Sequence, residues 1–208
     1  MPDTRRTSFV VLCVFSLGIA GYAAAVYGFM PLGALVHPDM RTTFRAHAVG
    51  IYCHIFASVV ALMLGPFQFS SRLRQSRPVV HRWMGRLYLG VGVLLGGSAG
   101  LYMAFHAFGG LGARLGFAGL AVSWLYSGLR AYLAIRSRDV ATHRRWMVRN
   151  FALTFAAVML RLYLPASMAA GIDFDIAYPV IAWLCWVPTL LAAELLFNRR
   201  LRSNVGLE

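Results

Sequence analysis

Histidine and arginine are the residues of this chain whose types and spacing could support chemistry. Two phrases repeat each other, "HRWMGRLY" at 81–88 and "HRRWMVRN" at 143–150, and each places His-Arg just ahead of Trp-Met and a further arginine. A neutral imidazole can ligate haem iron, and a forked guanidinium can hold a carboxylate or a phosphate. The repeated phrase therefore predicts either a paired ligand site or two equivalent corners of a membrane fold.

Two further side chains, His54 and Arg161, lie well inside apolar stretches. At helical rise, His54 lies about 12 Å from one end of its apolar stretch and Arg161 about 20 Å from the opposite side. A charged group at such a depth costs at least about 2.5 kcal/mol, so it faces the interior of a helix bundle and has a partner. We expect no acidic residue at that depth. The predicted partner of Arg161 is a backbone carbonyl, a water-filled cavity, or a ligand oxygen such as a haem propionate, a quinone carbonyl or a lipid phosphate.

The elements that must position these residues are membrane-spanning helices. The chain has 208 residues, of which 59% are hydrophobic and 13% are charged, and a soluble domain carries about twice that charged fraction. The composition predicts an all-α integral membrane protein that forms one membrane domain over 1–208. Six apolar stretches are long enough to cross a bilayer, and the predicted spans are 8–30, 46–67, 84–105, 111–135, 147–166 and 176–197.

The distribution of basic residues predicts the orientation. All 20 basic residues are arginines, and most of them fall on the side of the membrane that holds the N-terminus. The opposite side has only Arg41, Arg45 and Arg114, which by the positive-inside rule places both termini in the cytoplasm. The arginines cluster at the ends of apolar stretches, which argues against nucleic-acid binding.

The phrases also predict an internal repeat. Each lies where a cytoplasmic loop enters a helix, at the start of the third and the fifth predicted span. Spans two and three and spans four and five then form two hairpins of a central four-helix bundle. Parallel repeats are related by an axis along the membrane normal, which would bring His81 and His143 to one depth across a central cleft. Glycines at 92, 96 and 100 predict a face of close helix packing.

Several of these features occur together in one known family. The relevant residues are His54, Trp124, Arg161, "LGPFQF" at 64–69, "HRWMGRLY" at 81–88 and "HRRWMVRNFALT" at 143–154. With them the chain resembles, over about 47–164, a bacterial family of predicted membrane proteins catalogued as domain of unknown function 2306. The flanking spans 8–30 and 176–197 lie mostly outside this resemblance. The family name carries no activity, so the resemblance implies an architecture and a bacterial inner membrane, and it implies no mechanism.

The leading functional hypothesis is a redox protein that binds haem b and moves electrons in or across the membrane, with quinone as a partner. His81 and His143 would be ligands of an inner haem, and His54, with His47 or His106, would contribute to an outer one. His47 and His54 share one helix, so those two cannot clamp a haem between helices. The predicted anion-holding arginines are Arg82, Arg86, Arg144, Arg149 and Arg161.

Two alternatives remain open. In the first, the protein is a transporter or a lipid- or anion-binding protein, Arg161 holds an anionic group, and His54 acts in proton coupling. In the second, it is an accessory scaffold without a ligand. The sequence contains no phosphate-binding loop, no HExxH motif and no Ser/His/Asp set that can be argued, so whether the protein is an enzyme stays undecided. A haem absorbance band separates the first hypothesis from both alternatives.

Overall fold

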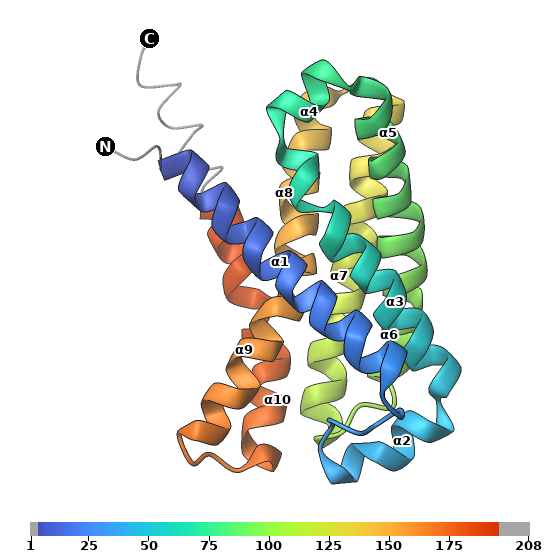
Figure 1. The fold of residues 1–208 in the computed structure, drawn as a ribbon, viewed down its shortest axis with the longest axis vertical. Helices are drawn as coiled ribbons and strands as arrows, with labels where there is room; N and C mark the ends of the chain where they lie inside the picture. Colours follow the sequence, from blue (N-terminus) through green and yellow to red (C-terminus); the bar gives the residue numbers. More distant parts are fainter. Residues whose placement is uncertain (1–3, 196–208) are drawn as a thin grey trace.

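The structure is a computed structural model that describes residues 4–195, and every regular element in that range is helical. Figure 1 shows long helices running along the molecule and short ones at the turns. In chain order the helices are α1 (Thr4–Phe29), α2 (Arg41–Ala46), α3 (Ala48–Leu64), α4 (Ser71–Ser76), α5 (Pro78–Leu87), α6 (Gly96–Ala104), α7 (Gly110–Arg136), α8 (Val140–Thr154), α9 (Ala156–Ala169) and α10 (Phe174–Leu184).

Within residues 4–195, five stretches are helical, long and apolar enough to cross a membrane. They are Phe9–Phe29, Ala48–Phe69, Pro78–Ala104, Val140–Ala169 and Phe174–Leu195. The chain is therefore a multi-pass, all-α membrane protein. The predicted span 111–135 corresponds to α7, which is long enough, but Arg114, Arg130, Arg136 and several glycines make it less apolar than the five. The predicted end of the last span, at 197, lies outside the described residues.

The third and fifth spans begin earlier than predicted. The third was expected from 84, but α5 begins at Pro78, because proline fits the first turn of a helix, where its missing N–H has no partner to lose. The fifth was expected from 147, but α8 begins at Val140 behind the capping residue Asp139. His81 and His143 are consequently each the fourth residue of a helix, at the same position in α5 and in α8.

The span that begins at Pro78 contains a π-helical segment, Tyr88–Leu95, between α5 and α6. Three glycines, one in this segment and two in α6, let the span approach α3. A Cβ at Gly92 would lie 2.8 Å from Ala61 Cβ, one at Gly96 3.2 Å from Ala57 Cβ, and one at Gly100 2.7 Å from the His54 ring. The close packing predicted from the glycine spacing is confirmed, and the third glycine makes the space for the His54 ring.

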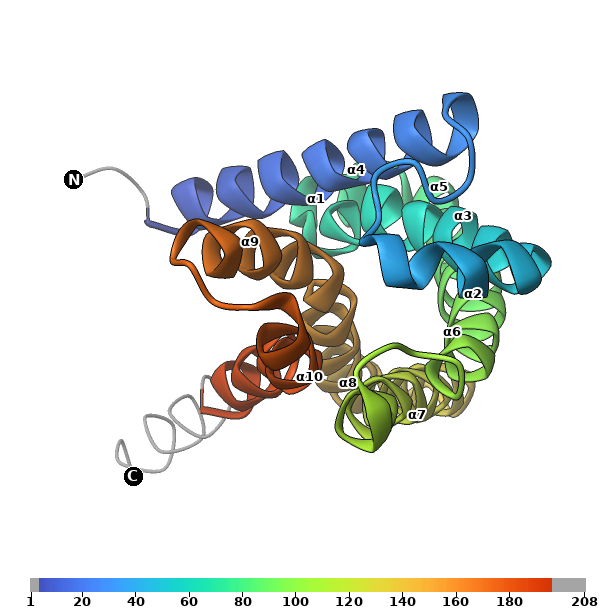
Figure 2. The same ribbon diagram turned by 90° about the horizontal axis from the view of Figure 1, so that it is seen from below.

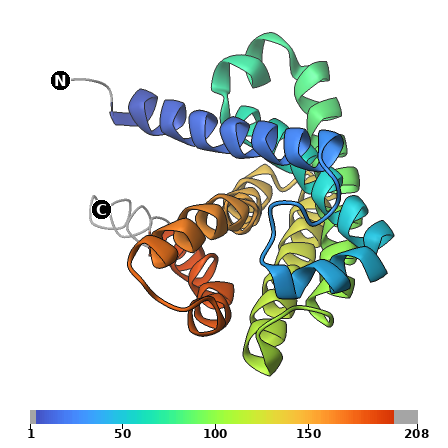
Figure 3. The same ribbon diagram turned by 60° about the horizontal axis from the view of Figure 1, so that its bottom comes forward.

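The helices are arranged as a ring when the molecule is seen along its long axis (Figure 2). The segments α3, α6, α7, α10, α9 and α1 follow one another around it, and α2 lies across one end. Helix α1 runs obliquely over the others and packs on both α3 and α9 (Figure 3). The span of α8 and α9 is interrupted at Phe155, so α9 diverges from the direction of α8 (Figure 1). The divergence leaves room inside the ring.

Candidate functional site

A cavity of about 820 Å³ lies inside this ring of helices. Small-molecule sites commonly have volumes of about 300–1,000 Å³, mostly apolar walls and a few polar groups. The cavity fits that description. Most of its lining is Ile, Leu, Val, Ala, Met and Phe. The polar residues among them are Tyr22, Tyr27, His37, Thr43, His54, Ser58, His106, Trp124, Thr154, Arg161 and Tyr178.

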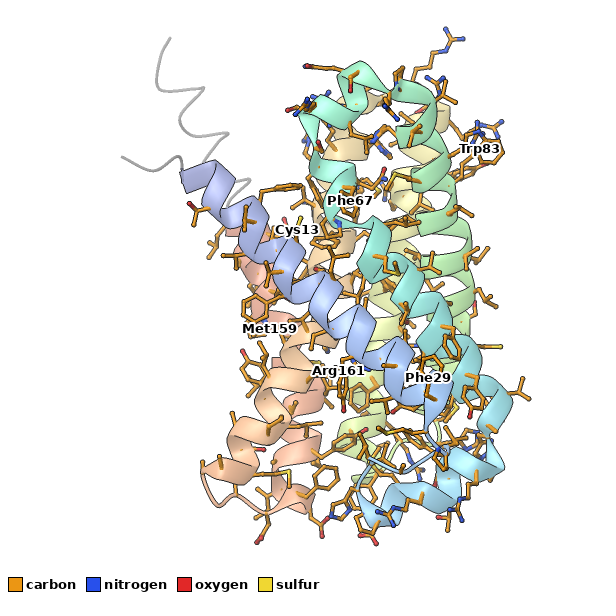
Figure 4. All side chains as sticks on the ribbon, viewed as in Figure 1. Cys13, Phe29, Phe67, Trp83, Met159 and Arg161 are labelled. Carbon is orange, nitrogen blue, oxygen red and sulfur yellow. The ribbon has the colours of Figure 1, made fainter. Side chains whose placement is uncertain are left out.

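Arg161 lines the cavity from α9, in the interior of the bundle (Figure 4). Its Nη1 donates to the carbonyl of Ala157 one turn earlier, at 3.0 Å. A guanidinium has five N–H donors, so this bond leaves most of them available to the cavity. The groups that interact with it electrostatically include the phenols of Tyr27 and Tyr22 on α1. Within residues 4–195 the carboxylate ion pairs are made by other residues, and Arg161 has no acidic partner there.

The backbone of α9 adds a polar group at the same level. Pro165 lies inside α9, which continues to Ala169, so this proline does not end the helix. It has no N–H to donate to the carbonyl four residues earlier, which is that of Arg161. Both residues line the cavity. Arg161 thus presents unpaired side-chain donors, and its own carbonyl lacks the usual N–H donor four residues later.

His54 lines the cavity from α3, and its ring has a defined protonation pattern. Its Nδ1 lies 2.9 Å from the carbonyl oxygen of Gly96. Because a carbonyl only accepts, Nδ1 carries the proton in this bond, and Nε2 of the neutral ring bears the lone pair. Gly100 leaves the ring its space, since a Cβ there would lie 2.7 Å from Nδ1. His54 and Arg161 are close enough to interact electrostatically.

Ser58 lies one turn after His54 on the same wall of the cavity. Its hydroxyl is buried and has no hydrogen-bond partner. Buried hydroxyls are usually paired. This one packs toward Gly96 of α6 and has almost no accessible surface, so it is not presented to the cavity. The cavity therefore offers donors from Arg161 and an acceptor from His54.

A second polar cluster, which we call the α7–α8 network, adjoins the cavity and is fully hydrogen-bonded. The Tyr88 hydroxyl donates to Asn150 Oδ1 at 2.7 Å and lies 2.7 Å from Thr154 Oγ1. The Trp124 indole N–H donates to Thr154 Oγ1 at 2.9 Å. The amide nitrogen of Asn150 donates to the Trp124 carbonyl and to Ser127 Oγ, both at 2.8 Å. Each polar side-chain group in the cluster has a partner.

Sequence reasoning missed three members of this network, Tyr88, Asn150 and Thr154, although they lie within the quoted motifs. The repeat contained a usable signal. Tyr88 and Asn150 each follow the histidine of their phrase by seven residues, so they are equivalent when the phrases are aligned on that histidine, although the Trp-Met pair is then shifted by one residue. In the structure the two side chains are hydrogen-bonded to each other. His81 and His143, the other equivalent pair, also interact electrostatically.

His81 and His143, the predicted ligands of the inner haem, differ in the partners of their ring nitrogens. His143 Nδ1 lies 2.8 Å from the carbonyl oxygen of Ala131 on α7, which leaves Nε2 for another partner. His81 Nδ1 is buried without a hydrogen-bond partner. Neither histidine lines the cavity that holds His54. Two of the predicted haem ligands thus lie near each other, and the third lies in a separate place.

The predicted outer partners of His54 pair with each other. His47 stacks on His106 with ring centroids 3.8 Å apart and an interplanar angle of 22°, and its Nδ1 lies 2.7 Å from the Tyr102 hydroxyl. His106 lines the cavity and His47 does not. Stacked imidazoles present their faces to each other, so they do not clamp an iron between them.

Of the five arginines predicted to hold an anion, only Arg161 lines the cavity. Arg82, Arg86 and Arg144 are exposed, and Arg86 lies over the Trp83 ring, 4.7 Å from its centroid. Arg149 makes a bidentate ion pair with Glu194. Among the residues that the structure describes, no group of three or more His, Cys, Asp or Glu side chains is placed to hold a metal ion.

Comparison with known proteins gives one match. No curated protein and no solved structure matches the chain. A family described as "Predicted membrane protein (DUF2306)" matches residues 51–197. The match therefore includes the last span, which we had expected to lie mostly outside the resemblance. It omits α1, which supplies Tyr22 and Tyr27 to the cavity. Because the match covers well over half of the chain, the protein belongs to the DUF2306 family of predicted membrane proteins.

Proposed function

We propose that this protein binds a lipid-soluble molecule with an oxygen-bearing head group, held by Arg161 in the cavity. The observation that carries the proposal is a guanidinium that faces an apolar cavity and has no acidic partner among the described residues. An arginine at that depth is costly and occurs where it has a functional partner. A ligand oxygen at Arg161, with an apolar body against the remaining walls, would supply that partner.

The proposal includes an orientation in the bacterial inner membrane. The arginine distribution favours cytoplasmic termini. We propose α7 as a sixth crossing, because it connects the end of α6 to the start of α8 and packs along both. The hydrogen bond between the equivalent residues Tyr88 and Asn150 supports two hairpin repeats around an axis that passes between them.

A second candidate is a haem b protein that exchanges electrons with quinone. It is supported by two histidines, His54 and His143, whose Nδ1 atoms bond backbone carbonyls and whose Nε2 atoms are free. Metal-ligating histidines commonly have this arrangement. In the cavity, His54 would be an axial ligand and Arg161 would hold a propionate. We rank it second because His54 lies apart from His81 and His143, so these three residues do not form one bis-histidine site.

Extraction of the purified protein tests the first candidate without assuming which lipid is bound. The protein is purified in mild detergent as wild type, Arg161→Leu and Arg114→Leu, and solvent extracts are compared by quantitative mass spectrometry. Arg114 is an exposed arginine of α7 that does not line the cavity, so it is the matched control. We expect one lipid-soluble species, near stoichiometric in wild type and Arg114→Leu, to be lost from Arg161→Leu. Identical extracts from all three proteins would refute the proposal and favour a ligand-free scaffold.

The same preparations decide between the two candidates. Reduced-minus-oxidised absorbance spectra are recorded after expression with added haem precursor. A b-type band that weakens in His54→Ala or His143→Ala would establish the haem protein. A protein without such a band, together with an Arg161-dependent species in the extract, would leave the lipid-binding proposal standing.

A further inference from the structure

The polar groups around the cavity differ in whether they donate or accept hydrogen bonds, and that difference restricts the head group of the ligand. Arg161 only donates hydrogen bonds. His54, with Nδ1 donating to the Gly96 carbonyl, presents at Nε2 a lone pair that only accepts. The two groups lie on different helices, α9 and α3, and line the same cavity. A complementary head group needs one oxygen that accepts from Arg161 and a separate O–H that donates to His54.

From this pattern we propose that the ligand is of the hydroquinone class, an aromatic ring with two hydroxyl oxygens and an apolar tail, and that His54 makes the site prefer it to the oxidised quinone. This inference rests on the proposed function and specifies its ligand. One ring oxygen accepts a hydrogen bond from Arg161, and the O–H of the other donates a hydrogen bond to Nε2 of His54. The tail occupies the apolar part of the cavity.

Other oxygen-bearing lipids match the pattern less well. A fatty acid carboxylate has two oxygens on one carbon, and both only accept hydrogen bonds. An oxygen placed near His54 would therefore be repelled by the lone pair of Nε2. A phosphate monoester can donate a proton, but it carries more charge than the single guanidinium of Arg161 balances in an apolar cavity. A quinone has two carbonyl oxygens, which only accept, so one of them is mismatched with His54.

The neighbouring side chains agree with this assignment. The phenols of Tyr22 and Tyr27 lie near Arg161 and can share its ligand oxygen as donors. Ser58 lies one turn from His54, but its hydroxyl oxygen is buried toward Gly96 of α6 and is not presented to the ligand. Neither group changes the requirement for a donor opposite Nε2, so the preference depends on His54.

The test compares one ligand in two oxidation states. Decylubiquinol, kept reduced under argon, and decylubiquinone are titrated into the purified full-length protein, and apparent Kd values are taken from the shift in unfolding temperature and from tryptophan fluorescence. Trp124 lines the cavity and serves as the reporter. We expect wild type to bind the quinol about tenfold more tightly or better, since a site with an unmatched buried polar group rejects the analogue that leaves it unpaired.

Three variants make the result specific. His54→Phe is expected to bind both forms with Kd values within about twofold of each other. His54→Gln, whose side-chain carbonyl can replace the Nε2 acceptor, is expected to restore most of the preference. Arg161→Leu is expected to weaken both forms. Equal binding of both forms by wild type, or a preference that survives in His54→Phe, would overturn the assignment of His54.

Failure of this inference is distinguishable from failure of the proposed function. If neither probe binds but the extract of wild type holds an Arg161-dependent lipid of another chemistry, the hydroquinone class is wrong and the cavity is still a binding site. If neither probe binds and the extracts of wild type and Arg161→Leu are identical, both proposals are wrong.

Discussion

Two buried polar regions lie side by side in this bundle, and they differ in how completely they are hydrogen-bonded. In the α7–α8 network, the side chains of Tyr88, Trp124 and Asn150 bond to one another or to nearby groups at 2.7–2.9 Å. In the adjacent cavity, Arg161 uses one donor on its own helix and the Ser58 hydroxyl has no partner. Thr154 belongs to the network and also lines the cavity, so the two regions share a boundary.

This difference in hydrogen bonding separates polar groups that stabilise the fold from polar groups that still have unused donors or acceptors. A fully paired polar network in a low-dielectric interior stabilises one arrangement of the helices around it. A group with unmet hydrogen-bonding capacity costs stability and is retained where something else binds it. Substitutions in the first region should therefore reduce stability and spare ligand binding, and substitutions in the second should do the reverse.

The largest stability effect is expected from Asn150→Leu, which removes the residue at the centre of the network. The change keeps the side-chain volume but removes the bonds of Asn150 to the Tyr88 hydroxyl, the Trp124 carbonyl and Ser127 Oγ. Unpaired buried polar groups cost about 1–3 kcal/mol each, so the free energy of unfolding should fall by about 2–4 kcal/mol. Unfolding in mixed detergent micelles measures it. A loss below about 0.5 kcal/mol would mean that the network is not structural.

Arg161→Leu should have the opposite effects, with little loss of stability and a large loss of bound lipid. The free energy of unfolding should stay the same or rise, because the change removes a costly cation from an apolar cavity. Bound lipid should fall at least about tenfold, which corresponds to the loss of a charge-assisted hydrogen bond of about 1.5–3 kcal/mol. The same micelle assay and the extract provide both readings. A marked destabilisation would place Arg161 among the structural residues and end the contrast.

Much of the fold could be predicted from the sequence, because the length of an apolar stretch and the spacing of glycines are properties of a single helix. The glycines at 92 and 96 pack against Ala61 and Ala57 as a close-contact face should. The start of the third span was misplaced because the polar phrase around His81 reads as a loop, whereas Pro78 begins a helix there. The glycine spacing thus predicted helix packing correctly, whereas the polar residues around His81 gave the wrong start for the helix.

The site was predictable only in part, since side-chain pairing across helices is a tertiary property. The depth of Arg161 in its apolar stretch pointed to the cavity, and His54 followed from similar reasoning. The other four arginines were chosen by sequence neighbourhood alone, and the ion pair of Arg149 with Glu194 depends on the last span packing beside α8. Tyr88 and Asn150 were missed because their residue types do not suggest a pair, and their contact depends on how the two phrases face each other in the bundle.

A matched pair of serines sharpens the contrast at smaller magnitude. Ser127 and Ser58 are both polar hydroxyls in the interior, but Ser127 accepts from Asn150 and Ser58 has no partner. Ser127→Ala should lower the free energy of unfolding by about 1–2 kcal/mol, and Ser58→Ala should leave it within about 0.5 kcal/mol. The two variants are measured in the same unfolding assay. Equal losses would show that the difference in pairing has no energetic consequence.

The smallest effect concerns Asp139, which lies outside both regions at the start of the helix that carries Asn150 and Thr154. Its carboxylate accepts from the backbone N–H of Thr142 at 2.9 Å, and this bond holds the pKa of the carboxyl below its ordinary value of 3.8. A carboxyl whose pKa is lower in the folded state stabilises the protein above its unfolded pKa. That stabilisation is lost as the pH falls through the lower folded value.

The pH dependence of unfolding should therefore separate wild type from Asp139→Asn. Asparagine also caps helices well, so the variant should match wild type near pH 7. Below about pH 4 wild type should lose the contribution of the ionised cap, and the variant, which does not titrate there, should decline less steeply. Because the cap supports α8 as a whole, Asp139→Asn should leave lipid binding at pH 7 unchanged. A variant that bound less lipid at pH 7 would mean that the position of α8 controls the cavity, and the two regions would then not be independent.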